Sequence, residues 1–352
     1  MRTTALNNRE EVMLNERELT VTAQALVAPH KGILAADESI GTIGKRFAKL
    51  GVESTAETHR AYRDMLFTTQ GMEEYISGVI LYDETIRQES LGGTPFARLL
   101  AEKGVIPGIK VDNGTVDFAL HPGEKIPEGL DGLRERLAEY RSLGARFTKW
   151  RAVITIGEGM PSRACVFANA HALARYAALA QEAGLVPIVE PEVLMDGDHD
   201  QQRCEMVTEG VLHSVFAELN RQGVLLEGIL LKPSMVVPGK SAPRQASLQE
   251  VAEATVRTLL RTVPAAVPGI AFLSGGQSSE VATAHLNAMN KMGPHPWELS
   301  FSYGRALQEP ALTIWRGEAV NVAAAQQAFR HRAQCNSAAR TGEYTPDIER
   351  QQ

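Results

Sequence analysis

A lysine stands near the end of an apolar run in the segment Leu226–Met235, whose sequence is LEGILLKPSM. Lysine is rarely buried without a reason, and burial in apolar surroundings lowers the pKa of an ammonium group. A neutral amine can attack a carbonyl carbon and form a Schiff base. Lys232 is therefore a candidate covalent catalyst. This segment alone leaves open the alternative that Lys232 ends a strand and extends its amine into water.

Other charged residues stand at the ends of further candidate strands. Glu190 and Glu192 share one face of their strand, because side chains alternate along a strand. Lys149 and Lys232 stand on two other candidate strands. The carboxylates of Glu190 and Glu192 and these two ammonium groups would shift one another's pKa values at one barrel mouth, as acid–base catalysis requires. The alternative, in which each charge caps its strand in solvent, is disfavoured by the recurrence of the pattern on several strands. The candidate residues are Asp37, Lys110, Lys149, Arg151, Glu190, Glu192 and Lys232.

Two groups of residues have the chemistry of anion sites. Ser274-Gly275-Gly276 is a glycine turn before a helix, and the free N–H groups of such a turn suit a phosphate, although a simple tight turn is the alternative. Ser302, Gly304 and Arg305 repeat the arrangement after the last candidate strand. A second anion site is predicted on the opposite side. Its residues are Ser39, Arg46, Lys110 and Arg151. Two phosphate pockets with a lysine between them suggest a linear bisphosphorylated sugar.

The elements that must position these residues are eight short apolar segments. Most are continuous apolar runs, which is typical of parallel strands covered by helices. Helical patterns lie between them, including Ala164–Ala183, Asp200–Gln222 with Met206 on its apolar stripe, and Leu248–Val263 with Leu260 on its stripe. The predicted strands are Lys31–Asp37, Ile76–Asp83, Val105–Asp112, Arg146–Ile154, Leu185–Leu194, Leu225–Met235, Gly269–Gly275 and Glu298–Gly304.

This alternation predicts an α/β fold of the (β/α)₈ TIM-barrel type, whose functional groups lie at the C-terminal ends of the strands. A doubly wound open sheet is the alternative, and the lack of a G-x-G-x-x-G after the first strand disfavours it. We expect a single barrel domain over residues 1–340, with extra N- and C-terminal helices. The polar segment Thr341–Gln352 is expected to be a flexible tail.

Composition excludes several classes of function. The net charge of −6 gives no basic surface for nucleic acid, and three widely spaced cysteines show neither a disulfide framework nor a metal spacing. We find no membrane-spanning run and no N-terminal signal core, so we expect a cytoplasmic protein. The histidines form no metal-binding motif, and the acidic turn Asp196–Asp200 is interpreted as the cap of the next helix. No metal or cofactor is expected.

Several of these segments, taken in order, resemble class I fructose-1,6-bisphosphate aldolase from about Ala23 to Leu307. The resemblance implies a metal-independent homotetrameric barrel of glycolysis and gluconeogenesis that cleaves fructose 1,6-bisphosphate reversibly to dihydroxyacetone phosphate and glyceraldehyde 3-phosphate. The motifs are KGILAADES from Lys31, GIKVD from Gly108, KWR from Lys149, VEPE from Val189, LLKP from Leu230, LSGGQ from Leu273 and SYGRAL from Ser302.

The resemblance also implies roles. Lys232 corresponds to the Schiff-base lysine, Glu190 to the acid–base residue of carbinolamine dehydration, and Asp37 to the aspartate that handles the C4 hydroxyl. Glu192 and Lys149 are similar to electrostatic partners. The C1-phosphate side is implied for Ser274, Gly275, Gly276, Ser302, Gly304 and Arg305, and the other phosphate side for Ser39, Arg46, Lys110 and Arg151.

The chain departs from the family pattern at two places. Ile40 stands where many members have threonine, and the chain ends without the terminal tyrosine that many members fold over the site, its last tyrosine being Tyr344. Roles of that terminal tyrosine do not transfer. The alternatives are the same chemistry on sedoheptulose 1,7-bisphosphate or fructose 1-phosphate, or a non-catalytic barrel scaffold. Loss of Lys232 or Glu190 would have favoured the scaffold, and both are present.

Overall fold

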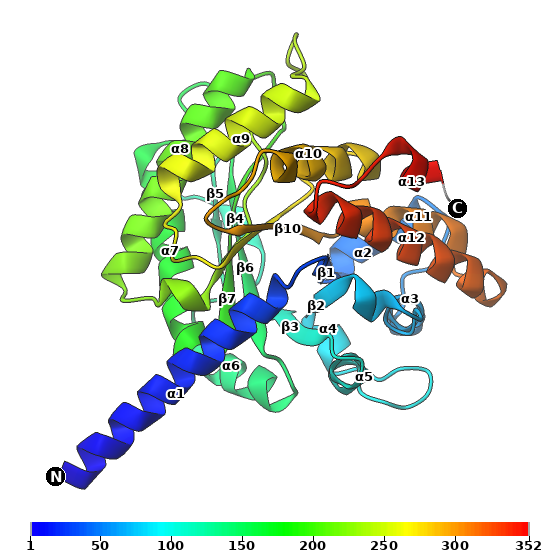
Figure 1. Cartoon of the computed structure of the whole chain (residues 1–352), viewed down its shortest axis with the longest axis horizontal. Helices are drawn as coiled ribbons and strands as arrows, with labels where there is room; N and C mark the ends of the chain where they lie inside the picture. Colours follow the sequence, from blue (N-terminus) through cyan, green and yellow to red (C-terminus); the bar gives the residue numbers. More distant parts are fainter. Residues whose placement is uncertain (1, 351–352) are drawn as a thin grey trace.

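A closed barrel of parallel strands forms the centre of the protein (Figure 1). The computed structural model describes residues 2–350, and side chains from Met13 onward. The strands follow one another around the barrel in the order β1-β10-β9-β8-β7-β6-β3-β2. The predicted (β/α)₈ barrel is therefore confirmed. Its strands are β1 (Gly32–Ala35), β2 (Ile76–Leu81), β3 (Ile106–Lys110), β6 (Phe147–Ile154), β7 (Val186–Val193), β8 (Leu230–Leu231), β9 (Gly269–Phe272) and β10 (Glu298–Tyr303).

Helices surround the barrel, and additional helices stand at both ends of the chain (Figure 1). They are α1 (Arg2–Leu26), α2 (Ile40–Ala48), α3 (Ala56–Phe67), α4 (Asp83–Ile86), α5 (Phe96–Glu102), α6 (Leu133–Ser142), α7 (Arg163–Glu182), α8 (Gln201–Arg221), α9 (Leu248–Thr262), α10 (Ser279–Lys291), α11 (Arg305–Trp315), α12 (Val322–Arg340) and α13 (Pro346–Arg350). Short 3₁₀ turns are η1 (Met72–Glu74), η2 (Leu226–Gly228) and η3 (Ala319–Asn321). Within the described part of the chain, every helix is too short or too polar to span a bilayer.

The strand predictions are correct in number and order, and most of the strands are one to three residues shorter than expected. The sixth predicted strand, Leu225–Met235, is the exception, because η2 occupies its first part and β8 is only Leu230–Leu231. The backbone still continues the ladder, since the N–H of Lys232 donates to the carbonyl of Val189 at 2.8 Å. The antiparallel hairpin β4 (Thr115–Asp117) and β5 (Lys125–Pro127) was not predicted.

The helix predictions hold at their ends and fail at two positions on their apolar stripes. Asp200 accepts a hydrogen bond from the N–H of Arg203 at 2.8 Å, so the acidic turn does cap α8 as predicted. The prediction that Met206 and Leu260 lie on the buried stripes of their helices is wrong, because their side chains are 57% and 56% exposed. Each lies about 100° around the helix from a buried neighbour, Val207 and Leu259, and this rotation turns it away from the barrel.

Two hydrophobic cores lie on the two faces of the sheet. The outer core fills the space between the strands and the helices. The inner core fills the barrel itself with Ile33, Phe147, Ile188 and Leu230, and side chains of α1 join it. Glycine is required at one point of this inner layer, because a methyl group on Gly108 would lie only 2.3 Å from Cζ of Phe147. The lower half of the barrel is therefore a packed apolar core.

The C-terminal half of α1 closes the lower end of the barrel (Figure 1). Leu19, Ala23 and Leu26 follow the spacing of one helix face and are buried in the inner core. Leu26 reaches so far in that a methyl group on Gly78 would lie 2.6 Å from its Cδ2. The extra N-terminal helix is thus part of the core that supports the upper, charged layer.

We expect Leu26→Ala to lower the free energy of unfolding by about 2–5 kcal/mol, because it leaves a cavity in the inner core. Val21→Ala on the same helix is the control: Val21 is 56% exposed, and its loss is expected to stay within about 0.5 kcal/mol. Urea unfolding of both variants measures the difference. Equal losses would contradict the packing of α1 into the barrel.

Candidate active site

Along the strands β6 and β7, the side chains that face the barrel interior change from apolar to charged toward the upper mouth. Phe147 lies in the inner core, and two residues later on β6 the side chain of Lys149 reaches the cavity at the upper mouth. On β7, Ile188 and Glu190 have the same relation. Because the period of a strand is two residues, the interior face of each strand continues upward from core to site.

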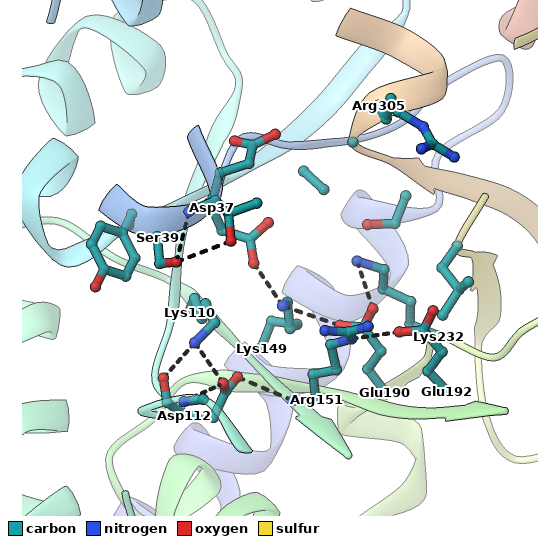
Figure 2. Close-up of a pocket in the computed structure, with 18 of the residues that line it drawn as sticks. Asp37, Ser39, Lys110, Asp112, Lys149, Arg151, Glu190, Glu192, Lys232 and Arg305 are labelled. Carbon is teal, nitrogen blue, oxygen red and sulfur yellow. Dashed lines mark hydrogen bonds and ion pairs between the residues drawn. The ribbon is translucent and has the colours of Figure 1, made fainter. Parts of the chain in front are cut away.

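Four of the predicted catalytic residues form one connected group (Figure 2). Nζ of Lys149 lies 2.6 Å from Oδ2 of Asp37 and 3.2 Å from Oε2 of Glu190. Nζ of Lys232 lies 3.2 Å from Oε1 of the same Glu190. Glu190 thus joins the two lysines with its two oxygens. The prediction from the sequence that these side chains meet at one mouth is correct.

The surroundings of Lys232 differ in one respect from those expected. Its side chain is only 4% exposed, which excludes an amine extended into water. The expected apolar surroundings are incomplete, because the carboxylate of Glu190 comes from β7, a different strand. The sequence of the segment LEGILLKPSM alone could not predict that contact. Lys232 is a buried lysine with a proton acceptor beside its nitrogen.

Asp37 and Lys149 hold each other in their charged forms. Burial alone raises the pKa of the Asp37 carboxyl, but the ammonium groups of Lys149 and Lys232 outweigh burial and hold that pKa well below its usual range. Burial alone lowers the pKa of Lys149, but the carboxylates of Asp37 and Glu190 outweigh burial and hold that pKa well above its usual range. Lys149 is therefore suited to a fixed positive charge, not to nucleophilic attack.

A second set of ion pairs lies beside this group (Figure 2). Arg151 pairs with Glu192, the neighbour of Glu190 on the same face of β7. The backbone N–H of Arg151 donates to Oδ2 of Asp112 at 3.1 Å, and Nζ of Lys110 lies 2.5 Å from Oδ1 of Asp112. Asp112 was not among the predicted site residues, although it ends the GIKVD motif. It holds the amine of Lys110 and the backbone of Arg151, two of the residues predicted for this side.

The predicted phosphate loop after β9 is present at the rim of the cavity. Gly275 and Gly276 have φ values of +58° and +91°, which glycine adopts without strain. Ser302 and Gly304 approach from the end of β10, and Arg305 begins α11. The hydroxyl of Ser302 is buried without a hydrogen-bond partner among the described residues. The glycine turn, the residue with the unpartnered hydroxyl and Arg305 therefore line one cavity.

The opposite phosphate side is also assembled, but its groups already have partners. Ser39 caps α2 by accepting from the N–H of Thr42 at 3.4 Å, and Arg46 contacts Oε1 of Glu38 at 2.5 Å. Glu38 also lines the cavity and was not among the predicted site residues, although it belongs to the KGILAADES motif. It is held by Arg63 at 2.5 Å and by Gln308 at 2.9 Å. Ile40, the departure from the family pattern, is exposed at the start of α2.

All predicted site residues line a single cavity of about 1130 Å³. They are Asp37, Ser39, Arg46, Lys110, Lys149, Arg151, Glu190, Glu192, Lys232, Ser274, Gly275, Gly276, Ser302, Gly304 and Arg305. Lys240 also lines it and was not predicted. The closed barrel explains this convergence, because residues far apart in sequence leave their strands at the same end.

Within the described residues, one group of His, Cys and Glu side chains has the spacing of metal ligands, and it lies outside this cavity. It consists of His331, Cys335 and Glu349. Both carboxylate oxygens of Glu349 are already bound, one by Arg332 and the other by the hydroxyl of Tyr344 at 2.6 Å. The group is therefore better explained as an anchor of the C-terminal segment.

The expectation of a free tail is wrong for the described part of Thr341–Gln352, whose last two residues lie outside the described range. The segment includes α13, and the N–H of Tyr344 donates to Oδ1 of Asn287 at 3.0 Å. The physical reason is Arg332, whose side chain is 3% exposed and takes its counterion from Glu349. A buried guanidinium needs a carboxylate, and the tail provides it.

Comparison with known proteins gives a consistent result. A family profile described as fructose-bisphosphate aldolase class-I matches residues 18–352. The "Probable fructose-bisphosphate aldolase class 1" of Xanthomonas campestris is 59% identical over 328 residues, which are 93% of this chain and 98% of that protein. Chicken fructose-bisphosphate aldolase B is 54% identical over 331 residues, 94% of this chain and 91% of that protein.

A solved structure shows the same fold. It is the fructose-bisphosphate aldolase of Plasmodium falciparum, determined in complex with TRAP and a small-molecule inhibitor. The two structures superpose with a TM-score of 0.93 at 50% sequence identity, covering 94% of this chain and 96% of the other. At this identity the likeness extends beyond the architecture of the barrel to the protein family.

The ion pair between Lys149 and Asp37 generates a stability prediction with a defined pH dependence. Lys149→Met leaves the Asp37 carboxylate mostly buried with its nearest cation gone, and we expect it to cost about 3–5 kcal/mol at pH 7. Loss of Lys149 removes the strongest attraction that lowers the pKa of Asp37 while the burial that raises it remains, so we expect this pKa to be higher in the variant than in the wild type. The folded variant then binds more protons in acid than the folded wild type does, so its stability should rise relative to wild type as the pH falls from 7 to 5.

In the wild-type protein the pKa of Asp37 is lowered instead. That contribution to stability is complete above the unfolded pKa of the carboxyl and is lost only in stronger acid. Urea unfolding at pH 7 and pH 5 measures both proteins. The double variant Lys149→Met with Asp37→Asn should be more stable than the single variant at pH 7. A single variant whose deficit is the same at both pH values would show that Asp37 is not left as a buried charge.

Proposed function

The chain belongs to the class I fructose-bisphosphate aldolase family, and we propose that Lys232 is the residue that forms its Schiff base with the substrate. Such an enzyme cleaves fructose 1,6-bisphosphate reversibly to dihydroxyacetone phosphate and glyceraldehyde 3-phosphate, a step of glycolysis and gluconeogenesis. The main observation that supports the proposal is the buried amine of Lys232, which lies 3.2 Å from a carboxylate oxygen of Glu190.

The first half of the reaction makes the electron sink. Glu190 takes a proton from the Lys232 ammonium, and the free amine attacks C2 of the ketose while Glu190 returns that proton to the carbonyl oxygen, which gives an N-protonated carbinolamine. Glu190 then moves a proton from the nitrogen to the C2 hydroxyl, which leaves as water and gives a protonated imine. Its distance of 3.2 Å from Nζ supports this role. Lys149 contributes a fixed positive charge beside the same carboxylate, at 3.2 Å from its other oxygen.

The second half breaks the carbon–carbon bond. Asp37 accepts the proton of the C4 hydroxyl, the C4 aldehyde forms, and the electrons of the C3–C4 bond move into the imine to give an enamine. The place of Asp37 in the cavity and its ionised state, which Lys149 maintains at 2.6 Å, support this role, since an ionised carboxylate can accept a proton. Protonation of the enamine at C3 and hydrolysis of the imine then release dihydroxyacetone phosphate and restore Lys232.

We propose that this chemistry needs no metal ion or cofactor. A protonated imine withdraws electrons from C3 more strongly than a ketone does, so it performs the task that a Lewis-acidic metal performs in other aldolases. The phosphates would be held by two groups: Ser274, Gly275, Gly276, Ser302, Gly304 and Arg305 on the C1 side, and Ser39, Arg46, Lys110 and Arg151 on the other. Glu192 would support the site by pairing with Arg151.

Assembly and location remain proposals as well. The family resemblance supports a homotetramer, which light scattering can test. A cytoplasmic location is supported by the Arabidopsis relative "Fructose-bisphosphate aldolase 5, cytosolic", 56% identical over 329 residues. All three cysteines are free and buried, which suits a reducing compartment. We also retain the division into a barrel domain over residues 1–340 and a tail over 341–352.

Borohydride trapping tests the nucleophile. We expect reduction in the presence of dihydroxyacetone phosphate to inactivate the enzyme and to leave the adduct on the peptide that contains Lys232. Lys232→Ala should lower kcat by several orders of magnitude, as loss of a covalent catalyst does, and turnover of the wild type should be unchanged after dialysis against a strong chelator. An adduct on Lys149 or Lys110 with an active Lys232→Ala variant would refute the assignment.

Truncation tests the C-terminal segment. Within the described residues, none after Gly342 lines the cavity, and the Tyr344 hydroxyl donates to Glu349. We therefore expect removal of residues 343–352 to lower the free energy of unfolding, because Arg332 loses its counterion Glu349, but to leave the turnover of the folded enzyme within about threefold, which is less than 1 kcal/mol. Tritium exchange into dihydroxyacetone phosphate should be measured beside single-turnover cleavage. A much larger fall in exchange than in cleavage would mean that the segment carries the proton to C3.

A further inference from the structure

A lysine outside the predicted site lies at the rim of the same cavity. Lys240 follows β8, and its short loop is bound to the loop after β7 by three backbone hydrogen bonds. They run from Gly239 N to His199 O at 2.8 Å, from Lys240 N to Met195 O at 2.7 Å and from Ser241 N to Gly197 O at 2.9 Å. The close contact needs glycine at position 239, where a methyl group would lie 2.3 Å from the Gly197 carbonyl oxygen. The backbone of Lys240 is therefore fixed in place.

The amine of Lys240 lies over the predicted phosphate loop. A methyl group built on Gly276 would be 3.3 Å from Nζ of Lys240 and 3.4 Å from Nη2 of Arg305. The two cationic groups thus lie close to the same glycine, where both could reach one anion bound at this loop. Lys240 comes from the β8 side of the loop and Arg305 from the start of α11.

The charges of the cavity explain why a second cation is needed there. Most of the predicted cations are held by carboxylates, as in the pairs Lys149–Asp37, Lys110–Asp112 and Arg46–Glu38. No carboxylate among the described residues forms an ion pair with Arg305. A phosphate ester carries a charge of about −1.5 to −2 near neutral pH. A single guanidinium therefore leaves part of that charge without compensation.

Lys240 is available for this task because its present partner holds it weakly. Nζ is 2.9 Å from Oδ1 of Asp196, and the two side chains are 50% and 64% exposed. Ion pairs between exposed side chains are worth about 0–1 kcal/mol, so exchange of Asp196 for a dianion costs little. Asp196 keeps the amine near the loop while the site is free of phosphate.

We propose that Lys240 is a further substrate-binding residue, which leaves Asp196 and binds the substrate phosphate at Ser274–Gly276 together with Arg305. This assignment rests on the proposed function, since it takes that loop as the C1-phosphate side. Its amine lies beside Gly276 and pairs with Asp196, and it forms no ion pair with the catalytic carboxylates Asp37 and Glu190 among the described residues. It therefore determines affinity for the phosphorylated ketone and takes no part in bond cleavage.

Trapping with dihydroxyacetone phosphate tests the proposal, because this ketone has only the one phosphate. We expect Lys240→Met to raise its half-saturating concentration for borohydride inactivation by about ten- to hundredfold, in line with loss of a hydrogen bond to a charged group. Lys240→Arg should recover most of the affinity. The matched control is Lys125→Met: Lys125 is also an ion-paired lysine, 41% exposed and bound to Asp117, but it lies outside the cavity. It should behave as wild type.

Unphosphorylated dihydroxyacetone separates phosphate binding from imine formation. Lys240→Met should trap it at the wild-type concentration. Equal losses for both ketones would overturn the proposal and give Lys240 a structural role. A loss with fructose 1,6-bisphosphate but not with dihydroxyacetone phosphate would assign Lys240 to the other phosphate and also overturn it. If the wild type forms no adduct on Lys232, the proposed function fails. If it does and Lys240→Met binds normally, only the present proposal fails.

Discussion

The carboxylate of Glu190 is the contact on which the arrangement of this protein depends. It lies between two buried ammonium groups, 3.2 Å from Nζ of Lys149 and 3.2 Å from Nζ of Lys232. A buried charge without a partner costs several kcal/mol, so Lys232, which has no other ion pair among the described residues, depends on this carboxylate. Lys149 shares it and also has Asp37 at 2.6 Å. Asp37 completes the group from the end of β1. Four strands of the barrel, β1, β6, β7 and β8, are thereby held in one register by the same charges that the reaction uses.

That register is possible because the lower layer of the barrel is apolar and closed. Phe147, Ile188 and Leu230 lie one side-chain layer below Lys149, Glu190 and Lys232 on the same strand faces. The end of α1 packs beneath them, so water is excluded from below. The charged layer then meets solvent only at the upper mouth. A shift of one residue in any of these strands would exchange its charged side chain for an apolar one.

Local sequence was sufficient for the strands, their order and the parity of the site residues, because strand periodicity is a property of consecutive residues. It could not supply contacts between elements. The partner of Lys232 comes from β7, and the partner of Arg332 comes from Glu349 in a segment that was expected to be free. Met206 was assigned to the apolar stripe because it is an apolar residue, whereas its exposure depends on which face of the helix packs against the barrel. Lys240 belongs to none of the motifs and becomes visible only when two loops pack together.

The two lysines beside Glu190 differ in their other ion pairs, and this difference decides which of them can lose its proton without leaving a buried carboxylate unpaired. Lys149 contacts both Asp37 and Glu190. If it lost its proton, Asp37 would lose its nearest cation. Lys232 has an ion pair with Glu190 alone among the described residues. If Lys232 gives up its proton, as the proposed reaction requires, Glu190 still has the cation of Lys149 beside it. One carboxylate shared by two lysines therefore permits deprotonation of only one of them without leaving a buried charge unpaired, and that one is the lysine that we propose as the nucleophile.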